Sequence, residues 1–217
     1  RRLNYGRWRH RLRDLFRASR VERNFRDGLW LEQAGIATAR PLAVGVRRVF
    51  RWPRCAYLIT EEVPEAVTLK GHIARRRVLP SPVIRRLAEL VAQLHEHQCS
   101  HRDLKGTNVL LDGQLRPWLI DLDGIRRCRR LGTRRAQADL KRLAAEFRAQ
   151  PLLWRWGWRR FLRRYCEIRQ MPAAFREWDR VIAAALPPVP PARPATPRSA
   201  ASPVPPSPNR PEPEVRR

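Results

Sequence analysis

The chain has 217 residues, enough for one domain with a full hydrophobic core or for two small ones. Lys and Arg total 46 against 20 Asp and Glu, so the formal net charge is +26, which favours phosphate-rich or otherwise anionic partners. No apolar run reaches the length of a membrane-spanning helix. The four widely spaced cysteines argue against a zinc ribbon and against a disulfide scaffold, and they favour reduced thiols in the cytoplasm.

The first third of the chain is predicted to form one helix and two strands. Phe25, Leu29 and Trp30 form an apolar stripe that predicts a helix over 20–33, which Gly35 ends. Two strands are predicted over 41–50 and 55–63, on either side of an Arg-Trp-Pro-Arg turn.

The middle and last parts of the chain alternate between helical patterns and a short hairpin. An amphipathic helix is predicted over 82–97, where we expect His95 and His97 to cap its end. Strands over 109–111 and 118–120 flank a turn at Asp112-Gly113. Three more helices are predicted, over 136–149, 153–168 and 173–186.

The hairpin carries two motifs typical of phosphoryl transfer. The first is H-R-D-L-K-G-T-N-V-L-L-D, over 101–112, and the second is L-I-D-L-D-G, over 119–124. Asp103 is the candidate base for an acceptor hydroxyl, and Lys105 lies where its ammonium could reach the transferring phosphoryl group. Asn108 and Asp121 supply the hard oxygen ligands that Mg²⁺ prefers beside the phosphates of ATP. A polar hairpin in an unrelated α+β domain is the alternative, but six matching features in order favour the kinase interpretation.

These motifs resemble those of the protein-kinase-like superfamily, and more closely those of the lipopolysaccharide core kinases, the Kdo kinase and WaaP-type group. The closer resemblance is carried by Ser19–Ala43, by D-L-D at 121–123 in place of Asp-Phe-Gly, and by A-D-L-K-R-L at 138–143. It implies an α+β, bilobal, protein-kinase-like fold over 1–185, with a truncated N-terminal lobe over 1–63 and a mainly helical C-terminal lobe over 64–185. It also implies ATP and Mg²⁺ as cofactors, with the backbone of Glu61 and Val63 meeting the adenine edge.

The chain departs from the resemblance near its start. A Gly-rich turn over the phosphates and a strand lysine are needed there, yet Gly6 is the only glycine before Ser19 and the first lysine is Lys70. We expect the missing strands to precede this sequence rather than to have degenerated. The resemblance implies a helix carboxylate that pairs with that lysine, and distance to Gly35 favours Asp27, with Glu22 as the alternative. Asp123 is the alternative to Asp121 as metal ligand.

The segment after D-L-D bears on the substrate. Seventeen residues separate Asp121 from Asp139, too few for the peptide platform of a protein kinase, and the basic stretch 125–135 could clamp an anionic glycolipid. The sequence therefore predicts an ATP-dependent kinase of a sugar hydroxyl in the lipopolysaccharide core. A Ser/Thr protein kinase, favoured by Lys105, and a degenerate pseudokinase or basic binding module, favoured by the missing phosphate loop, stay open.

Two segments bear on location and partners. The interleaved aromatic and basic residues of 154–165 are typical of a helix at an anionic membrane surface, with core packing beneath an Arg-rich face as the alternative. We expect a cytoplasmic monomer that binds nucleic acid only non-specifically, and peripheral contact with the inner membrane stays open. Twelve of the 20 prolines fall in 186–217, so this tail is predicted to be disordered.

Overall fold

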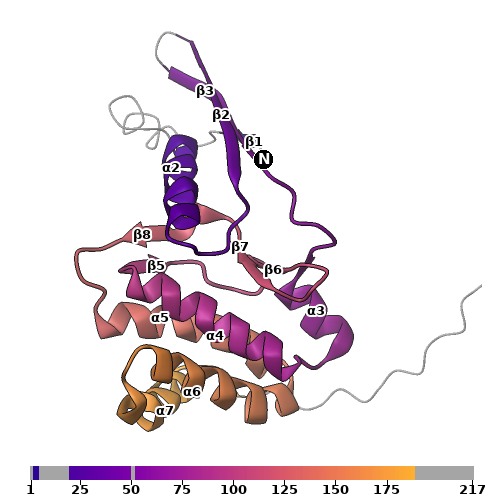
Figure 1. Cartoon of the computed structure of the whole chain (residues 1–217), viewed down its shortest axis with the longest axis vertical. Coiled ribbons are helices and arrows are strands. Elements are labelled where there is room, and N and C mark those ends of the chain that lie inside the picture. The colour runs from indigo at the N-terminus through magenta and orange to yellow at the C-terminus, as the bar shows by residue number, and fades with distance from the viewer. Residues whose placement is uncertain (1, 5–19, 50–51, 189–217) are drawn as a thin grey trace, which may run out of the picture.

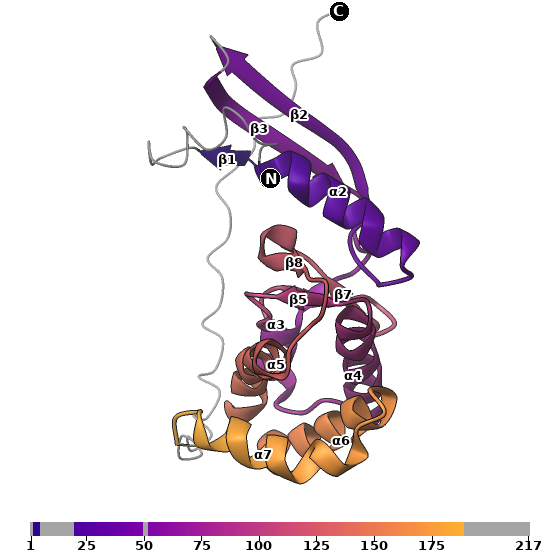
Figure 2. The ribbon, with the colours of Figure 1, turned by 90° about the vertical axis from the view of Figure 1, so that its left-hand side faces the viewer.

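The structure, a computed structural model, describes residues 2–4, 20–49 and 52–188. Its upper part in Figure 1 joins one helix to an antiparallel sheet in the order β1-β3-β2. These elements are β1 (Arg2–Asn4), α2 (Arg20–Gln33), β2 (Pro41–Val49) and β3 (Trp52–Thr60). Figure 2 shows α2 lying along the sheet, above the rest of the molecule.

The ends of α2 and β3 follow from individual residues. Gly35 takes a φ of +70°, a conformation that ends the helix at no steric cost to a residue without Cβ. The strand predicted to reach residue 63 ends at Thr60, three residues earlier. The partner strand β2 begins at Pro41, which lies opposite Thr60, so β3 has no strand residue to pair with beyond this point.

The lower part is mainly helical and carries short strands next to the upper part (Figures 1 and 2). Its strands form two small sheets, in the orders β4-β6-β7 and β5-β8. The strands are β4 (Val67–Thr68), β5 (Cys99–His101), β6 (Val109–Leu111), β7 (Pro117–Leu119) and β8 (Ile125–Arg127). The helices are α3 (Leu69–Arg76), α4 (Ser81–Glu96), α5 (Thr133–Arg148), α6 (Arg159–Ile168) and α7 (Phe175–Ala184).

The core of the lower part lies between α4, α5 and α6. The apolar stripe of α4 is buried, and the aromatic rings of the segment 154–165 join it. Phe147 stacks edge-on against Trp158, and Phe161 lies between Trp158 and Tyr165. Trp158, Phe161 and Tyr165 are all at most 1% exposed. Most of the aromatic side chains in this segment therefore pack in the core, beneath exposed arginines.

The helix predicted over 153–168 is one continuous segment with two geometries. Leu153–Trp158 forms a π-helical turn, and α6 follows without a break. Gly157 allows this packing, because a Cβ there would lie 2.6 Å from a methyl carbon of Leu153. The last helix begins at Phe175 because Pro172 opens a short 3-10 turn before it. Across the described residues, no helix is long and apolar enough to cross a membrane.

Candidate active site

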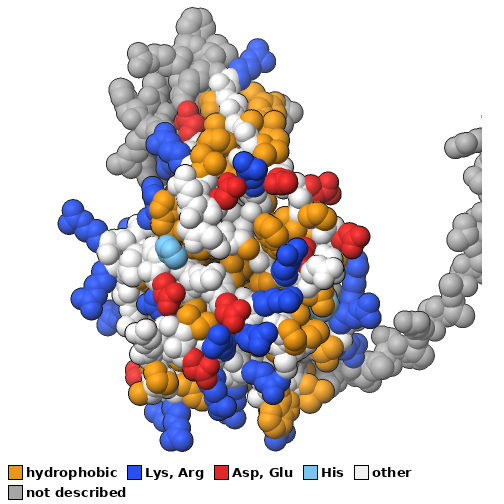
Figure 3. All heavy atoms as spheres, viewed as in Figure 1, with side chains coloured by type: hydrophobic (Ala, Val, Ile, Leu, Met, Phe, Trp, Pro, Cys, Tyr) orange, Lys and Arg blue, Asp and Glu red, His pale blue; other side chains and the backbone are white. Residues whose placement is uncertain are grey.

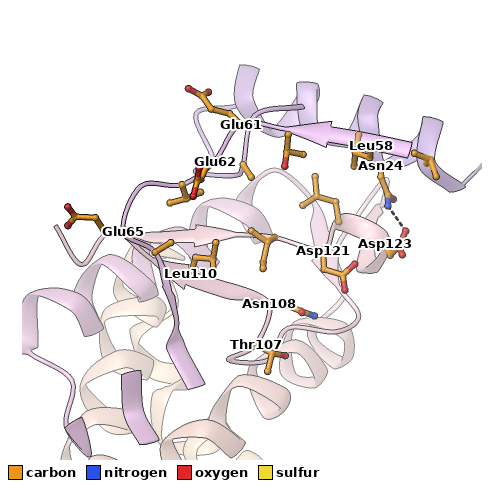
Figure 4. Close-up of a pocket in the computed structure, with 17 residues that line it drawn as sticks. Asn24, Leu58, Glu61, Glu62, Glu65, Thr107, Asn108, Leu110, Asp121 and Asp123 are labelled. Carbon is orange, nitrogen blue, oxygen red and sulfur yellow. Dashed lines mark hydrogen bonds between the residues drawn. The ribbon is translucent and has the colours of Figure 1, made fainter. Parts of the chain in front are cut away.

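A cavity of about 770 Å³ separates the upper part from the β6–β7 hairpin. The end of β3 and the residues after it form one wall, and the hairpin and the turn after β7 form another. Figure 4 shows Asn24 reaching into this region from α2, above Asp121 and Asn108. Five of the residues named from the sequence line the cavity, whereas Asp103 and Lys105 do not; the five are Glu61, Val63, Asn108, Asp121 and Asp123.

Asp103 and Lys105 lie in the loop that joins β5 to β6. The Lys105 ammonium is 2.7 Å from Oδ2 of Asp103, and both side chains are about half exposed. The hydrogen bond from Lys105 lowers the pKa of Asp103; burial opposes this shift, and a hydrogen bond from Asn108 adds to it. The Asp103 carboxylate is therefore ionised at neutral pH, as acceptance of a proton requires.

Asn108 connects Asp103 to the turn that follows β7. Its Nδ2 donates to the backbone oxygen of Asp103 at 2.8 Å and to Oδ2 of Asp103 at 2.9 Å. Because both amide hydrogens are used in this way, Oδ1 is the part of the side chain that remains to ligate a cation. The backbone oxygen of Asn108 accepts from the N–H of Ile120 at 3.0 Å, which holds Asp121 beside it.

Asp121 has a backbone conformation that is rare for a residue with a side chain. Its φ and ψ are 59° and 60°, in the left-handed region. Such conformations cost about 1–3 kcal/mol and persist where the surrounding structure imposes them, often at functional sites. In Figure 4 the Asp121 carboxylate points into the cavity, above Asn108. One carboxylate and one amide oxygen fit a Mg²⁺ ion that keeps several waters and also binds phosphate.

The segment after β3 presents backbone groups to the cavity. The N–H of Glu61 donates to the backbone oxygen of Arg40 at 2.8 Å, so it is not available to a ligand. Val63 is only 8% exposed, yet its N–H and C=O make no hydrogen bond to any described residue. Buried backbone groups are normally paired, so this position suits a planar ligand with a donor and an acceptor on one edge, as adenine has.

The residues of α2 that line the cavity are Val21 and Asn24, and Asp27, the expected helix carboxylate, does not line it. Oδ1 of Asp27 lies 3.5 Å from Nε of Arg127, whose guanidinium also covers the ring of Trp30. Burial raises the pKa of Asp27, although Arg127 and two other arginines lower it. Glu22, the alternative, is not among the residues that line the cavity.

Asn24 and Arg20 hold the D-L-D turn against α2. Nδ2 of Asn24 donates to Oδ1 of Asp123, and Arg20 pairs with Oδ2 of the same carboxylate at 2.5 Å. Asp123 is thus bound to the helix, which favours Asp121 over Asp123 as the metal ligand. Asn24 lies in the buried stripe of α2 with Val21, Gly28 and Leu31. The period of this stripe marks Asn24 as an inward-facing position, but the resemblance implied a carboxylate on this helix, and Asn24 carries an amide.

Asp139 of α5 lies beneath the loop that joins β5 to β6, which we call the catalytic loop. Its Oδ2 accepts from the backbone N–H of His101 at 2.9 Å and lies 3.4 Å from Nε2 of His95. His95 does not cap α4 as predicted, because its ring is fully buried and its Nδ1 is 2.7 Å from the Tyr165 hydroxyl. His97 does bond the helix end, through Nδ1 and the backbone oxygen of Gln93.

The imidazole of His101 is also buried, beneath the catalytic loop. Its Nδ1 accepts the N–H of Asp103 at 3.2 Å. Burial lowers the pKa values of His95 and His101, so both rings are neutral at neutral pH. His101 therefore has a supporting position under the loop, and Asp103 is the ionised group above it.

The basic segment 125–135 begins with β8, which pairs with β5, the strand that precedes the catalytic loop. Arg127 is held by Asp27, and Nη1 of Arg135 donates to Sγ of Cys128 at 3.2 Å. The four other arginines are exposed and form no ion pair within the described residues; they are Arg126, Arg129, Arg130 and Arg134. The predicted clamp is therefore reduced to these four side chains.

Comparison with known proteins identifies the family of this chain. The model of the lipopolysaccharide kinase (Kdo/WaaP) family matches residues 4–165. A 3-deoxy-D-manno-octulosonic acid kinase of Vibrio cholerae serotype O1 is 31% identical over 118 residues, which cover 54% of this chain and 48% of the relative. The enzyme of the same name from Pasteurella multocida is 32% identical over 151 residues, covering 65% and 61%. The chain thus spans about half of the first relative and three fifths of the second.

Among solved structures, the bifunctional kinase-methyltransferase WbdD is similar, with a TM-score of 0.49 and 18% identity over 76% of this chain and 40% of WbdD. The expected α+β, protein-kinase-like fold is confirmed, with the sheet and α2 above the cavity and the helical part below it. The family model covers well over half of the sequence. The chain therefore belongs to the lipopolysaccharide kinase (Kdo/WaaP) family.

Proposed function

We propose that this protein transfers a phosphoryl group from ATP to a sugar hydroxyl of the lipopolysaccharide core. The observation that carries the proposal is that Asp103 is hydrogen-bonded to Asn108, which lines one cavity together with Asp121 and Val63. ATP fits this arrangement with adenine at Val63 and phosphates at Asn108 and Asp121. Membership of a lipopolysaccharide kinase family supports the choice of acceptor.

Each residue has one task in the proposed reaction. Asp103 orients the acceptor hydroxyl and takes its proton, while the Lys105 ammonium neutralises charge on the transferring group. Asn108 and Asp121 would hold Mg²⁺, which neutralises phosphate charge when bound. The N–H and C=O of Val63 would bind the adenine edge.

The basic segment favours an anionic acceptor over a peptide. Only the short strand β8 and its connection lie between the D-L-D turn and α5, so few residues are available to support an extended polypeptide. The exposed guanidinium groups of Arg126 and Arg129 instead suit phosphate or carboxylate groups of a core glycan.

Phosphate transfer from labelled ATP tests the proposal directly. The acceptor is purified lipid A–core glycolipid with Mg²⁺, and a panel of protein substrates is assayed in parallel. We expect label in the glycolipid, and a loss of roughly 10²–10⁴-fold in Asp103→Asn, which keeps the shape but not the base. Label in protein alone would support the protein-kinase alternative, and absence of both transfer and ATP-dependent thermal stabilisation would overturn the proposal.

A further inference from the structure

Large hydrophobic side chains are exposed at the start of the segment that leads into α6. Leu152, Trp156 and Val78 are 69%, 68% and 56% exposed. They border a groove of about 170 Å³, which the buried side chains of Ile84 and Leu153 also line. An exposed tryptophan beside an apolar groove is unusual on a protein surface that contacts only water.

A basic groove of about 320 Å³ adjoins the apolar one. The two grooves share Ser81 and Arg160, and the guanidinium of Arg160 donates to the Ser81 hydroxyl. Within the described part of the chain, Arg85, Arg160 and Arg163 form no ion pair and all are exposed.

The remaining charged residues of the basic groove largely neutralise one another. Arg164 lies 3.1 Å from Glu89 and 3.6 Å from Glu167, and Glu167 also lines the groove. The groove therefore keeps a net positive charge from its three arginines without ion-pair partners.

Helical spacing aligns the apolar and basic groups into one surface. Leu152, Trp156, Arg160 and Arg163 follow each other at intervals of four, four and three residues along a continuous helical segment. Figure 3 shows hydrophobic and basic side chains interspersed along the lower edge of the molecule, the end where Figure 1 draws α6. We call Val78, Arg85, Leu152, Trp156, Arg160 and Arg163 the α6 face.

We propose that the α6 face binds the surface of an anionic phospholipid bilayer. Trp156 and Leu152 match the region between acyl chains and head groups, where tryptophan is favoured. The three arginines match lipid phosphates, to which guanidinium groups bind through paired hydrogen bonds. A protein partner would need acidic groups opposite these arginines as well as an apolar contact. Nucleic acid would contact the arginines but would leave the exposed side chains of Leu152 and Val78 without an apolar partner.

The α6 face is separate from the proposed active site. In Figure 1, α6 lies at the end of the lower part that is farthest from the sheet and α2. The cavity lies on the opposite side of that part, beside Asn108 and Asp121. A bilayer against the α6 face would therefore leave the cavity open to ATP and to an acceptor.

Flotation of the full chain with lipid vesicles at physiological salt tests the inference. Vesicles of phosphatidylcholine alone are compared with vesicles that also contain phosphatidylglycerol. We expect binding to the mixed vesicles only, weakened about fivefold for each arginine removed, since each contributes on the order of 1 kcal/mol near an anionic surface. The test variants are Trp156→Ala and the double change Arg160→Gln with Arg163→Gln.

Matched controls separate a local surface from a general effect of charge. The double change Arg26→Gln with Arg47→Gln removes the same charge from positions on α2 and β2, and Leu42→Ala shortens an exposed apolar side chain far from α6. These controls should keep full vesicle binding. Equal weakening in controls and test variants, equal binding to neutral vesicles, or self-association through Trp156 without vesicle binding would each overturn the inference.

The outcome is independent of the enzymatic proposal. ATP-dependent thermal stabilisation and phosphate transfer to a solubilised acceptor are measured on the same variants. We expect both to match the unmodified chain, because no residue of the α6 face lines the cavity. Vesicle binding without phosphate transfer would overturn the proposed function and leave the membrane proposal intact. Phosphate transfer without vesicle binding would overturn the membrane proposal and leave the proposed function intact.

Discussion

Asn24 of α2 donates a hydrogen bond to Asp123, which lies 99 residues later in the chain and two residues beyond the proposed metal ligand. This bond joins the upper part of the molecule to the turn that carries Asp121. Because Arg20 binds the other oxygen of the same carboxylate, α2 fixes both oxygens of Asp123. The helix thereby holds the turn that carries Asp121 in place.

Asn24→Ala should lower kcat/KM for ATP by roughly fivefold, the effect of losing a hydrogen bond worth about 1 kcal/mol. Asn24→Asp should lower it further, because a second carboxylate would face Asp123. Asp27→Asn is the control, since Asp27 pairs with Arg127 and does not line the cavity. Steady-state kinetics at varied ATP provide the measurement. Equal effects of the Asn24 and Asp27 changes would contradict this role for Asn24.

Asp121→Asn should raise the Mg²⁺ concentration needed for half-maximal activity by roughly tenfold or more, because it removes an anionic ligand. Asp123→Asn should change this Mg²⁺ requirement much less, because Asp123 is occupied by Arg20 and Asn24. Titration of activity with Mg²⁺ at saturating ATP compares the two. A larger shift for Asp123→Asn would reverse the assignment of the metal ligand.

Lys105→Met should move the acidic limb of the activity profile to higher pH. The hydrogen bond from Lys105 is the main reason that the pKa of Asp103 lies below the ordinary carboxyl value. Its loss allows the pKa to rise, so Asp103 becomes protonated, and unable to accept a proton, at a less acidic pH. The dependence of kcat/KM on pH measures the change. An acidic limb that stays in place would mean that another group controls it.

The catalytic motifs could be predicted from sequence because their chemistry depends on local spacing. Asp103 and Asn108 are five residues apart, and one loop brings the Asn108 amide onto the Asp103 carboxylate. The hairpin, α2 and α4 could also be predicted, since each has a strong period or a clear turn residue. Glu61 and Val63 line the cavity, and their contact with adenine stays a prediction.

Long-range pairs and short elements could not be predicted in the same way. The bond between Asn24 and Asp123 depends on how α2 sits over the turn, which local spacing does not determine. Strands β5 and β8 have three residues each and form because they pair with each other, with Ser100 opposite Arg126. The boundaries of the predicted lobes and the disorder of the tail stay predictions; from residue 189 onward the tail lies outside the described residues.

Asp112→Asn should destabilise the fold by about 2–3 kcal/mol, because Asp112 is buried and organises the hairpin turn. Its carboxylate accepts from the backbone of Gln114 and Arg116 and from the Trp118 indole. Burial alone would raise the pKa of Asp112, but these hydrogen bonds lower it. The stabilisation is therefore present above the ordinary carboxyl pKa and is lost as pH falls through the lowered value.

Urea denaturation at neutral and acidic pH checks the prediction for Asp112. Glu32→Gln is a matched control, since Glu32 forms an exposed ion pair with Arg40, and such pairs contribute about 0–1 kcal/mol. The difference between Asp112→Asn and the unmodified chain should shrink as the solution becomes more acidic. A neutral-pH effect no larger than that of Glu32→Gln would show that the turn does not depend on Asp112.

His95→Gln should reduce the loss of stability that occurs in mild acid. Burial lowers the pKa of His95 despite the opposing influence of Asp139, and Arg169 lowers it further. The unfolded chain therefore binds a proton below about pH 6.5 that the folded chain does not, so stability falls from that pH down to the lowered folded pKa. A glutamine side chain at this position cannot bind the proton, which removes one contribution while that of buried His101 remains.

The measurement for His95 is the free energy of unfolding between neutral pH and mild acid. His97→Gln serves as the control, because the His97 ring is exposed, bonds the helix end and packs edge-on against Trp30. We expect a shallower slope in His95→Gln than in His97→Gln, together with lower stability at neutral pH from the weakened contacts with Tyr165 and Asp139. Equal slopes would mean that His95 is not protonated on unfolding in this range, and that the acid sensitivity comes from other groups.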